Sequence, residues 1–133
     1  MLELNRIVTF LITANPDPAL AFYRDSLGFA FVKDDGFALV FDAHGIMLRI
    51  AKTKPGQFTP APYTVLGWEV EDISEAVKQL ADRGVIFERY SQMPQDKDGV
   101  WTAPGGDKVA WFKDPDGNVL SLSQHVGGAD NSQ

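Results

Sequence analysis

The feature that most constrains the fold is an order of predicted elements that occurs twice along the 133 residues. In each half, an apolar strand is followed by an amphipathic helix and then by three short strands with glycine-containing turns between them. Tyr23 and Leu80 take equivalent places in the two helices, so the repeat is about 57 residues long. Sequence identity between the halves is weak, and the repeat therefore lies in the pattern of elements.

This order of elements predicts an α+β fold. A sheet with one helix has one covered face and one open face. Two βαβββ modules can bring their open faces together, so we expect them to form a curved mixed sheet around a small-molecule cavity. The chain is long enough for one domain with a sizeable core.

The module boundaries follow from a proline-rich stretch near the middle of the chain, which contains Pro55, Pro60 and Pro62. Proline and glycine interrupt regular structure, so we interpret this stretch as a linker. The single predicted domain, residues 1–133, therefore divides into a first module (5–52), a linker (53–62), a second module (63–125) and a frayed polar tail (126–133).

In the first module, β-branched and apolar residues predict a strand over 7–13. Asp17 is the expected N-cap of the helix, with Pro18 in the first helical position and Gly28 at its end. Aspartate–glycine and histidine–glycine pairs mark the turns between three further strands, which are expected over residues 29–33, 37–41 and 46–51.

In the second module, a strand is expected over 63–70 and a helix between Asp72, its N-cap, and Gly84. The helix presents Ile73, Val77 and Leu80 on one face, and Trp68 is expected on the helix-facing side of the sheet. A polar loop is predicted over 91–99. Further strands or extended segments are expected over residues 85–90, 100–102, 108–113 and 119–124.

Charge and composition exclude several classes of function. The twelve lysines and arginines are scattered and outnumbered by eighteen acidic residues, which argues against a nucleic-acid partner. No apolar run approaches the roughly 20 residues of a membrane span, and the N-terminal residues lack the features of a signal peptide. The chain has no cysteine, so disulfides and thiol chemistry are excluded. We expect a cytoplasmic protein with no membrane partner.

Two motifs carry a resemblance to a known family. Residues 19–29, Ala-Leu-Ala-Phe-Tyr-Arg-Asp-Ser-Leu-Gly-Phe, resemble the first helix of the vicinal oxygen chelate superfamily, which includes glyoxalases, bleomycin resistance proteins and extradiol dioxygenases. Residues 111–120, Trp-Phe-Lys-Asp-Pro-Asp-Gly-Asn-Val-Leu, resemble its last hairpin, and residues 70–73 with 80–84 match its second helix. The resemblance covers about residues 5–125 and implies the paired-module fold.

The resemblance also implies a metal ligand on the first and fourth strand of each half. Counting from the two motifs, these positions hold Val8, Met47, Val65 and Ser121. None of these side chains is a good ligand for a hard or borderline divalent ion, which prefers histidine nitrogen or carboxylate oxygen. We therefore expect no metal site and no cofactor.

Because side chains alternate along a strand, the same positions predict which residues point into the cavity. The predicted set is mostly apolar with a few polar groups, as in many small-molecule sites. Tyr63, Phe58 and Met93 are expected near its mouth. The predicted ligand-binding residues are Arg49, Glu69, Trp111, Trp101, Phe10, Met47 and Ser121.

Arg49 and Glu69 allow more than one interpretation. They can form an ion pair with each other and have no role in ligand binding. Alternatively, Arg49 binds a ligand carboxylate while Glu69 orients the ligand or, as the one candidate catalytic residue, accepts a proton.

The remaining polar candidates are interpreted as peripheral. His44 lies in a predicted turn, and His125 follows the last strand, at the surface, at a dimer edge or at the mouth of the cavity. Ser121 has no base beside it in the sequence, so no nucleophilic role is predicted for it.

Three functions are compatible with these residues. The first is a metal-independent binding protein for a small, partly aromatic or carboxylate-bearing compound, with an acidic surface that suits a cationic ligand. The second is a glyoxalase-like lyase or isomerase, either metal-dependent or using Glu69 as acid and base. The third is an interaction domain. We expect a homodimer, because the resemblance implies half-barrels that complete each other within or between chains.

Overall fold

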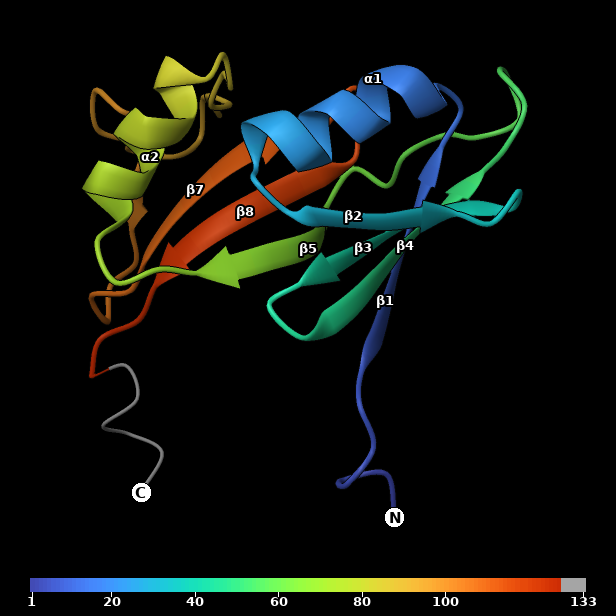
Figure 1. Cartoon of the computed structure of the whole chain (residues 1–133). Helices are drawn as coiled ribbons and strands as arrows, with labels where there is room; N and C mark the ends of the chain where they lie inside the picture. Colours follow the sequence, from blue (N-terminus) through green and yellow to red (C-terminus); the bar gives the residue numbers. More distant parts are fainter. Residues whose placement is uncertain (128–133) are drawn as a thin grey trace. The chain divides into compact units, whose positions relative to one another are not determined.

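The computed structural model describes residues 1–127 and shows an α+β fold built from two compact units, Met1–Pro60 and Ala61–Gln133 (Figure 1). Each unit contains a four-stranded mixed sheet and one helical segment, which confirms the predicted βαβββ order. The shared cavity stays a prediction. Most of the predicted tail lies outside the described residues. No helix within residues 1–127 is long and apolar enough to span a membrane.

The first unit has its strands in the order β1-β4-β3-β2. β1 runs parallel to β4, whereas β3 is antiparallel to both β4 and β2. The elements are β1 (Val8–Thr13), α1 (Pro16–Ala21), the π-helical turn η1 (Phe22–Ser26), β2 (Ala30–Asp34), β3 (Ala38–Ala43) and β4 (Ile46–Lys52).

The first helix begins two residues earlier than predicted. Its N-cap is Asn15 rather than Asp17, and Pro16 takes the first turn, where the missing proline N–H costs no helical hydrogen bond. The chain then widens into η1, where the Leu27 N–H donates to the Phe22 carbonyl at 2.9 Å. Gly28 ends the segment with φ of +82°, as predicted from its position.

The core of the first unit lies on the sheet face that contacts this helical segment. Tyr23 is fully buried and its ring centroid lies 5.9 Å from that of Phe41. Leu48 and Ile50 on β4 are also fully buried. Burying each such side chain contributes about 1.5–3 kcal/mol, so this face stabilises the unit.

The second unit repeats the arrangement, with strand order β5-β8-β7-β6 and β5 parallel to β8. The Asp72 carboxylate accepts a hydrogen bond from the Glu75 N–H at 3.1 Å, which confirms the predicted N-cap of the second helix. The elements are β5 (Thr64–Glu69), α2 (Ile73–Asp82), β6 (Trp101–Thr102), β7 (Lys108–Lys113) and β8 (Val119–Gln124).

The predicted strand over 85–90 is wrong. This segment makes one isolated bridge, between Phe87 and Phe112, and the edge of the sheet is instead taken by β6. The Gln95 side chain explains the difference, because its amide accepts from the Tyr90 N–H and donates to the carbonyls of Glu88 and Gly99. These bonds occupy backbone groups that a longer strand would need for pairing.

The core of the second unit lies between α2 and one face of β7 and β8. Phe112 and Leu120 are fully buried, and Ile73 and Val77 of α2 are almost fully buried. Trp68 stacks on Phe112, with ring centroids 6.4 Å apart, and so lies on the helix-facing side as predicted. The opposite face of this sheet has no helix and carries the half-buried residues considered below.

The turn between β7 and β8 depends on one buried carboxylate. Asp114 is 5% exposed and accepts hydrogen bonds from the backbone N–H groups of Asp116 and Asn118, at 2.9 and 3.0 Å. Its second oxygen accepts from the Asn118 side-chain amide at 2.8 Å. The turn is therefore held by its side chains as well as by its backbone.

We expect Asp114→Ala to destabilise the protein by about 1–3 kcal/mol, because it leaves buried donors without an acceptor. The matched control is Asp17→Ala, which removes an exposed carboxylate that does not cap the helix, and should cost about 0.5 kcal/mol or less. Urea unfolding of the three proteins measures both changes. Equal effects of the two substitutions would contradict the assignment of Asp114.

Candidate functional site

The helix-free face of the β5–β8 sheet carries most of the predicted site residues of the second unit. Strand register places Trp111 beside Ser121, and Ser121 beside Gly67. In the next row, Ser123 lies between Glu69 and Val109. Since side chains alternate, these residues point away from the core formed with α2. These residues therefore share one face of the sheet, as their alternation along the strands predicts.

One end of this face is hollowed into a pocket of about 430 Å³. Its walls are mainly aromatic and apolar, with a few hydroxyl and amide groups, which is the usual composition of a small-molecule site. Of the three residues expected near the mouth of a cavity, Tyr63 and Met93 line this pocket, whereas Phe58 does not. The lining residues are Pro62, Tyr63, Thr64, Tyr90, Gln92, Met93, Trp111 and Val119.

Trp111 joins two aromatic contacts at this pocket. Its ring meets Tyr90 edge-on with centroids 5.5 Å apart, and the ring centroid of Trp101 lies 6.2 Å away. Burial, together with the nearby charge of Glu88, raises the pKa of the Tyr90 hydroxyl. The hydroxyl is therefore protonated at neutral pH and can donate a hydrogen bond to a ligand.

Tyr90 and Gln92 were missed by the sequence analysis. Tyr90 falls at the end of the segment predicted as a strand, and Gln92 in the adjoining polar loop. The bonds of Gln95 fold this segment back against β7, so that Tyr90 meets Trp111. A cluster of aromatic residues on either side of the polar loop was the one available signal.

Ser121 is 9% exposed and faces a glycine on the neighbouring strand. A Cβ atom placed on Gly67 would lie only 2.5 Å from the Ser121 Oγ atom. The Ser121 side chain therefore occupies the space above Gly67, beside Trp111 and outside the pocket lining.

Glu69 is exposed at the end of β5, opposite Ser123. It is not part of the pocket lining, and within residues 1–127 its carboxylate forms no ion pair. The structure thus places this predicted acid–base residue on the same sheet face as Trp111 but outside the pocket.

Arg49 belongs to the first unit, where it pairs with Asp35 at 2.7 Å. Both side chains are about one-quarter exposed. Asp35 also accepts from the N–H groups of Phe37 and Ala38. The Arg49 guanidinium and these N–H groups hold the pKa of Asp35 far below its usual range. In this arrangement Arg49 stabilises the β2–β3 turn.

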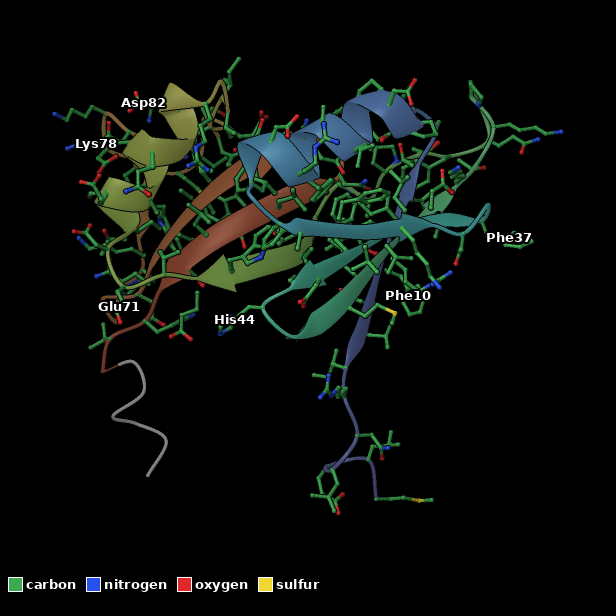
Figure 2. All side chains as sticks on the ribbon, viewed as in Figure 1. Phe10, Phe37, His44, Glu71, Lys78 and Asp82 are labelled. Carbon is green, nitrogen blue, oxygen red and sulfur yellow. The ribbon has the colours of Figure 1, made fainter. Side chains whose placement is uncertain are left out.

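The helix-free face of the first unit is apolar and exposed. Val8 lies directly beside Met47, and Phe10 directly beside Arg49. The exposed fractions are 41% for Val8, 66% for Phe10 and 44% for Met47, and Phe10 is marked on β1 in Figure 2. A hollow of about 310 Å³ on this unit is lined by Arg6, Val32, Val40, Phe41, Asp42, Gly45 and Met47.

The four positions that correspond to family metal ligands do not fit a divalent ion. Val8 and Met47 are cross-strand partners, so their backbone arrangement suits two ligands, but neither side chain has a hard donor. Val65 lies at an irregularity in the β5–β8 pairing, and Ser121 offers only a hydroxyl. Within the described part of the chain, no cluster of three or more histidine or acidic side chains is placed to hold a metal.

His44 lies at the tip of the β3–β4 turn with φ of +54°, as the turn prediction requires (Figure 2). His125 follows β8, where it contacts Ser123 and Asp107. The position of His125 after the last strand predicted a place at the surface, at a dimer edge or at the cavity mouth, but not its contacts with these two residues.

Comparisons with known proteins agree with this architecture. The family model described as Glyoxalase/Bleomycin resistance protein/Dioxygenase superfamily matches residues 3–122. No match was found among curated proteins.

Two solved structures illustrate the likeness. A member of the glyoxalase/bleomycin resistance protein/dioxygenase superfamily from Sphaerobacter thermophilus is 24% identical, with a TM-score of 0.70, covering 94% of this chain and 100% of that one. A lactoylglutathione lyase from Agrobacterium tumefaciens is 20% identical, with a TM-score of 0.69, covering 93% and 96%. At these identities the likeness establishes the fold alone.

The Arg49–Asp35 pair predicts a pH-dependent stability difference. Because the folded pKa of Asp35 is depressed, its contribution is present above the unfolded pKa of about 3.9 and is lost as the pH falls below it. We expect Arg49→Gln to lower the urea midpoint at pH 7 and to have less effect at pH 3.

The matched control is Arg24→Gln, which removes a more exposed pair between neighbouring residues, Arg24 and Asp25, and should change the midpoint little at either pH. If the difference in urea midpoint between the wild type and Arg49→Gln grew as the pH fell, it would contradict the assigned role of this pair.

Proposed function

Because this chain belongs to the glyoxalase/bleomycin resistance protein/dioxygenase superfamily, we propose that it is a metal-independent small-molecule-binding protein whose ligand sits against Trp111. The observation that carries the proposal is the aromatic pocket of about 430 Å³ in the second unit. Pockets of roughly 300–1,000 Å³ suit ligands of drug-like size. Trp111 forms part of the wall of this pocket, and the ring of Trp101 contacts Trp111.

The lining favours a flat, partly aromatic ligand. The rings of Trp111 and Tyr90 meet edge-on, so two perpendicular aromatic surfaces are available for stacking and edge contacts. The Tyr90 hydroxyl and the Gln92 amide supply hydrogen bonds that orient a polar substituent. The net charge of −6 favours a neutral or cationic ligand over an anionic one.

Metal independence rests on side-chain chemistry. Valine has no donor atom, and the methionine thioether is a soft donor that does not suit Mg²⁺ or Mn²⁺. Protein Zn²⁺ sites use cysteine, histidine and carboxylate ligands, and none of these stands at the four positions. The serine hydroxyl is a weak ligand without further donors around it. In this proposal the open face keeps its binding role while Val8 and Met47 contribute only apolar surface.

We further infer that the protein is a homodimer in solution. Val8, Phe10, Ile12 and Met47 form a contiguous apolar set on one sheet face, each between 38% and 66% exposed. Exposed apolar patches of this kind mark interaction sites in soluble proteins. A second copy of the chain covers this face in the proposed dimer.

Binding can be tested by thermal-shift screening of planar aromatic amines, since a ligand of the folded state raises its unfolding temperature. For the strongest compound, we expect Trp111→Ala to weaken the affinity measured by calorimetry at least about tenfold, because it removes the pocket wall. Phe37→Ala, which removes an exposed ring at the β2–β3 turn, is the control and should leave affinity unchanged (Figure 2).

Dialysis against a chelator should likewise leave this affinity unchanged. Loss of binding after chelation would contradict metal independence, and equal binding by Trp111→Ala would contradict the assignment of the pocket.

Light scattering coupled to size exclusion tests the dimer. We expect a mass of about twice 14.6 kDa for the wild type and 14.6 kDa for Phe10→Glu, because a carboxylate cannot be buried at that face without a partner. Phe37→Glu is the control, since Phe37 lies outside this face and is 81% exposed. A wild-type protein that elutes at 14.6 kDa at all concentrations would overturn the inference.

A further inference from the structure

Three polar side chains at the far end of the β5–β8 sheet form a continuous hydrogen-bonded line. The Ser123 Oγ atom lies 2.9 Å from His125 Nε2. His125 Nδ1 lies 3.0 Å from Asp107 Oδ2, on the opposite side of the ring. Ser121 has no base beside it in the sequence, whereas Ser123 contacts the imidazole of His125, two residues further along the chain.

The chemistry of the carboxylate determines the direction of these bonds. An ionised carboxylate can only accept, so His125 must donate from Nδ1 to Asp107. A neutral imidazole with its proton on Nδ1 has a free lone pair on Nε2, and this lone pair accepts the Ser123 hydroxyl proton. The array is thus arranged as nucleophile, base and orienting acid.

Asp107 is itself held in place. Its other oxygen, Oδ1, accepts from the Val126 N–H at 2.8 Å. This bond and the contact with His125 lower the pKa of Asp107, so the carboxylate is ionised at neutral pH. Asp107 therefore both orients the imidazole and ties the end of β8 to the turn before β7.

The array is accessible to a small molecule. Ser123 is half-buried on the helix-free face, and the side chains of His125 and Asp107 are 46% and 44% exposed. The row of cross-strand neighbours on this face runs from Glu69 through Ser123 and Val109 to Trp101. An apolar and aromatic surface thus lies on one side of the hydroxyl, and a carboxylate on the other.

The array is separate from the ligand pocket proposed above. That pocket reaches β8 at Val119 and β7 at Trp111, and the cross-strand partner of Trp111 is Ser121, two residues from Ser123. Ser123 and His125 also lie just beyond the residues matched by the family model. None of Ser123, His125 and Asp107 lines the pocket, so substitutions of these three residues leave the pocket wall in place.

We propose that Ser123, His125 and Asp107 form a nucleophilic site that accepts acyl groups from small aryl esters. The Ser123 oxygen bonds to the ester carbonyl carbon as His125 Nε2 takes the hydroxyl proton, and the carbon–oxygen bond to the alcohol then breaks. The leaving alcohol receives the proton from His125. Water repeats the sequence on the acyl-serine, releasing the acid and restoring the hydroxyl.

The surroundings select the substrate class. Trp101 and Val109 provide a surface on which an aromatic leaving group can lie. Glu69 and Asp107 place negative charge next to the hydroxyl, which disfavours anionic substrates. We therefore expect neutral or cationic aryl esters to react and carboxylate-bearing esters to react poorly.

Reaction of the full chain with 4-nitrophenyl acetate and with an alkyl fluorophosphonate tests the proposal. We expect one acetyl or phosphonyl group per chain, located on Ser123 by peptide mass spectrometry. With the fluorophosphonate, the serine oxygen bonds to phosphorus, fluoride leaves, and the proton passes through His125 to solvent.

The variants distinguish activation of Ser123 from general surface reactivity. Ser123→Ala should abolish labelling, and His125→Gln should slow it at least about 100-fold by removing the base. His44→Gln and Ser74→Ala remove an exposed histidine and an exposed serine elsewhere and should react like the wild type.

Asp107 acts as a positioning residue. Asp107→Asn retains an oxygen for the Val126 N–H but presents an N–H to the imidazole, which favours the tautomer that cannot accept from Ser123. We expect kcat for 4-nitrophenyl acetate to fall at least about tenfold with KM unchanged, and Asp107→Glu to recover part of the rate.

Labelling of a residue other than Ser123 would overturn the proposal. So would equal labelling rates for the wild type and His125→Gln, provided that circular dichroism shows the variant to be folded.

Discussion

The parallel pairing of the first and last strands within each module is the interaction on which the rest of the structure depends. β1 pairs with β4, and β5 pairs with β8. Parallel neighbours need a long crossover, which the helical segment and the two middle strands supply. Residues from the beginning and end of each module thereby come together, as Val8 does with Met47 and Gly67 with Ser121. The helix then covers one sheet face and leaves the other without a helix.

The two ends of the open face in the second unit differ in chemistry. Near Val119, the surface forms a pocket with aromatic walls. The segment that follows the bridge between Phe87 and β7 folds back there and brings Tyr90 against Trp111. Near Ser123, the end of β8 turns toward Asp107, and short polar side chains meet there. Strand β8 contributes to both the pocket and the polar cluster, because its alternate residues point to the same side along its whole length.

The acidic character of the chain has a structural explanation in its turns. Asp34, Asp42 and Asp96 each accept backbone N–H groups from residues two to four positions later. Asp35 does the same in the β2–β3 turn, and Asp114 in the β7–β8 turn. These carboxylates accept hydrogen bonds from backbone N–H groups that have no backbone acceptor in a tight turn. Five of the eighteen acidic residues therefore stabilise turns, and Arg49 contributes to one of these turns through its ion pair with Asp35.

The sequence alone determined the repeated module, the order of its elements, the Asp72 cap and the sheet face to which Trp111, Ser121 and Glu69 belong. These features depend on local propensity and on a two-residue period, both of which are present in adjacent residues. The absence of metal-ligating side chains at Val8, Met47, Val65 and Ser121 is equally a property of the sequence.

Only the tertiary structure decided which side chains meet. The residues over 85–90 have a strand-like sequence, but the amide of Gln95 takes their backbone partners, and Tyr90 becomes a pocket wall. Arg49 has a carboxylate partner fourteen residues earlier, and His125 has one eighteen residues earlier. Contacts of this kind depend on strand register and turn direction. Register and turn direction are set by the packing of the whole unit, so a local sequence pattern does not predict the distance between side chains that are far apart in the sequence.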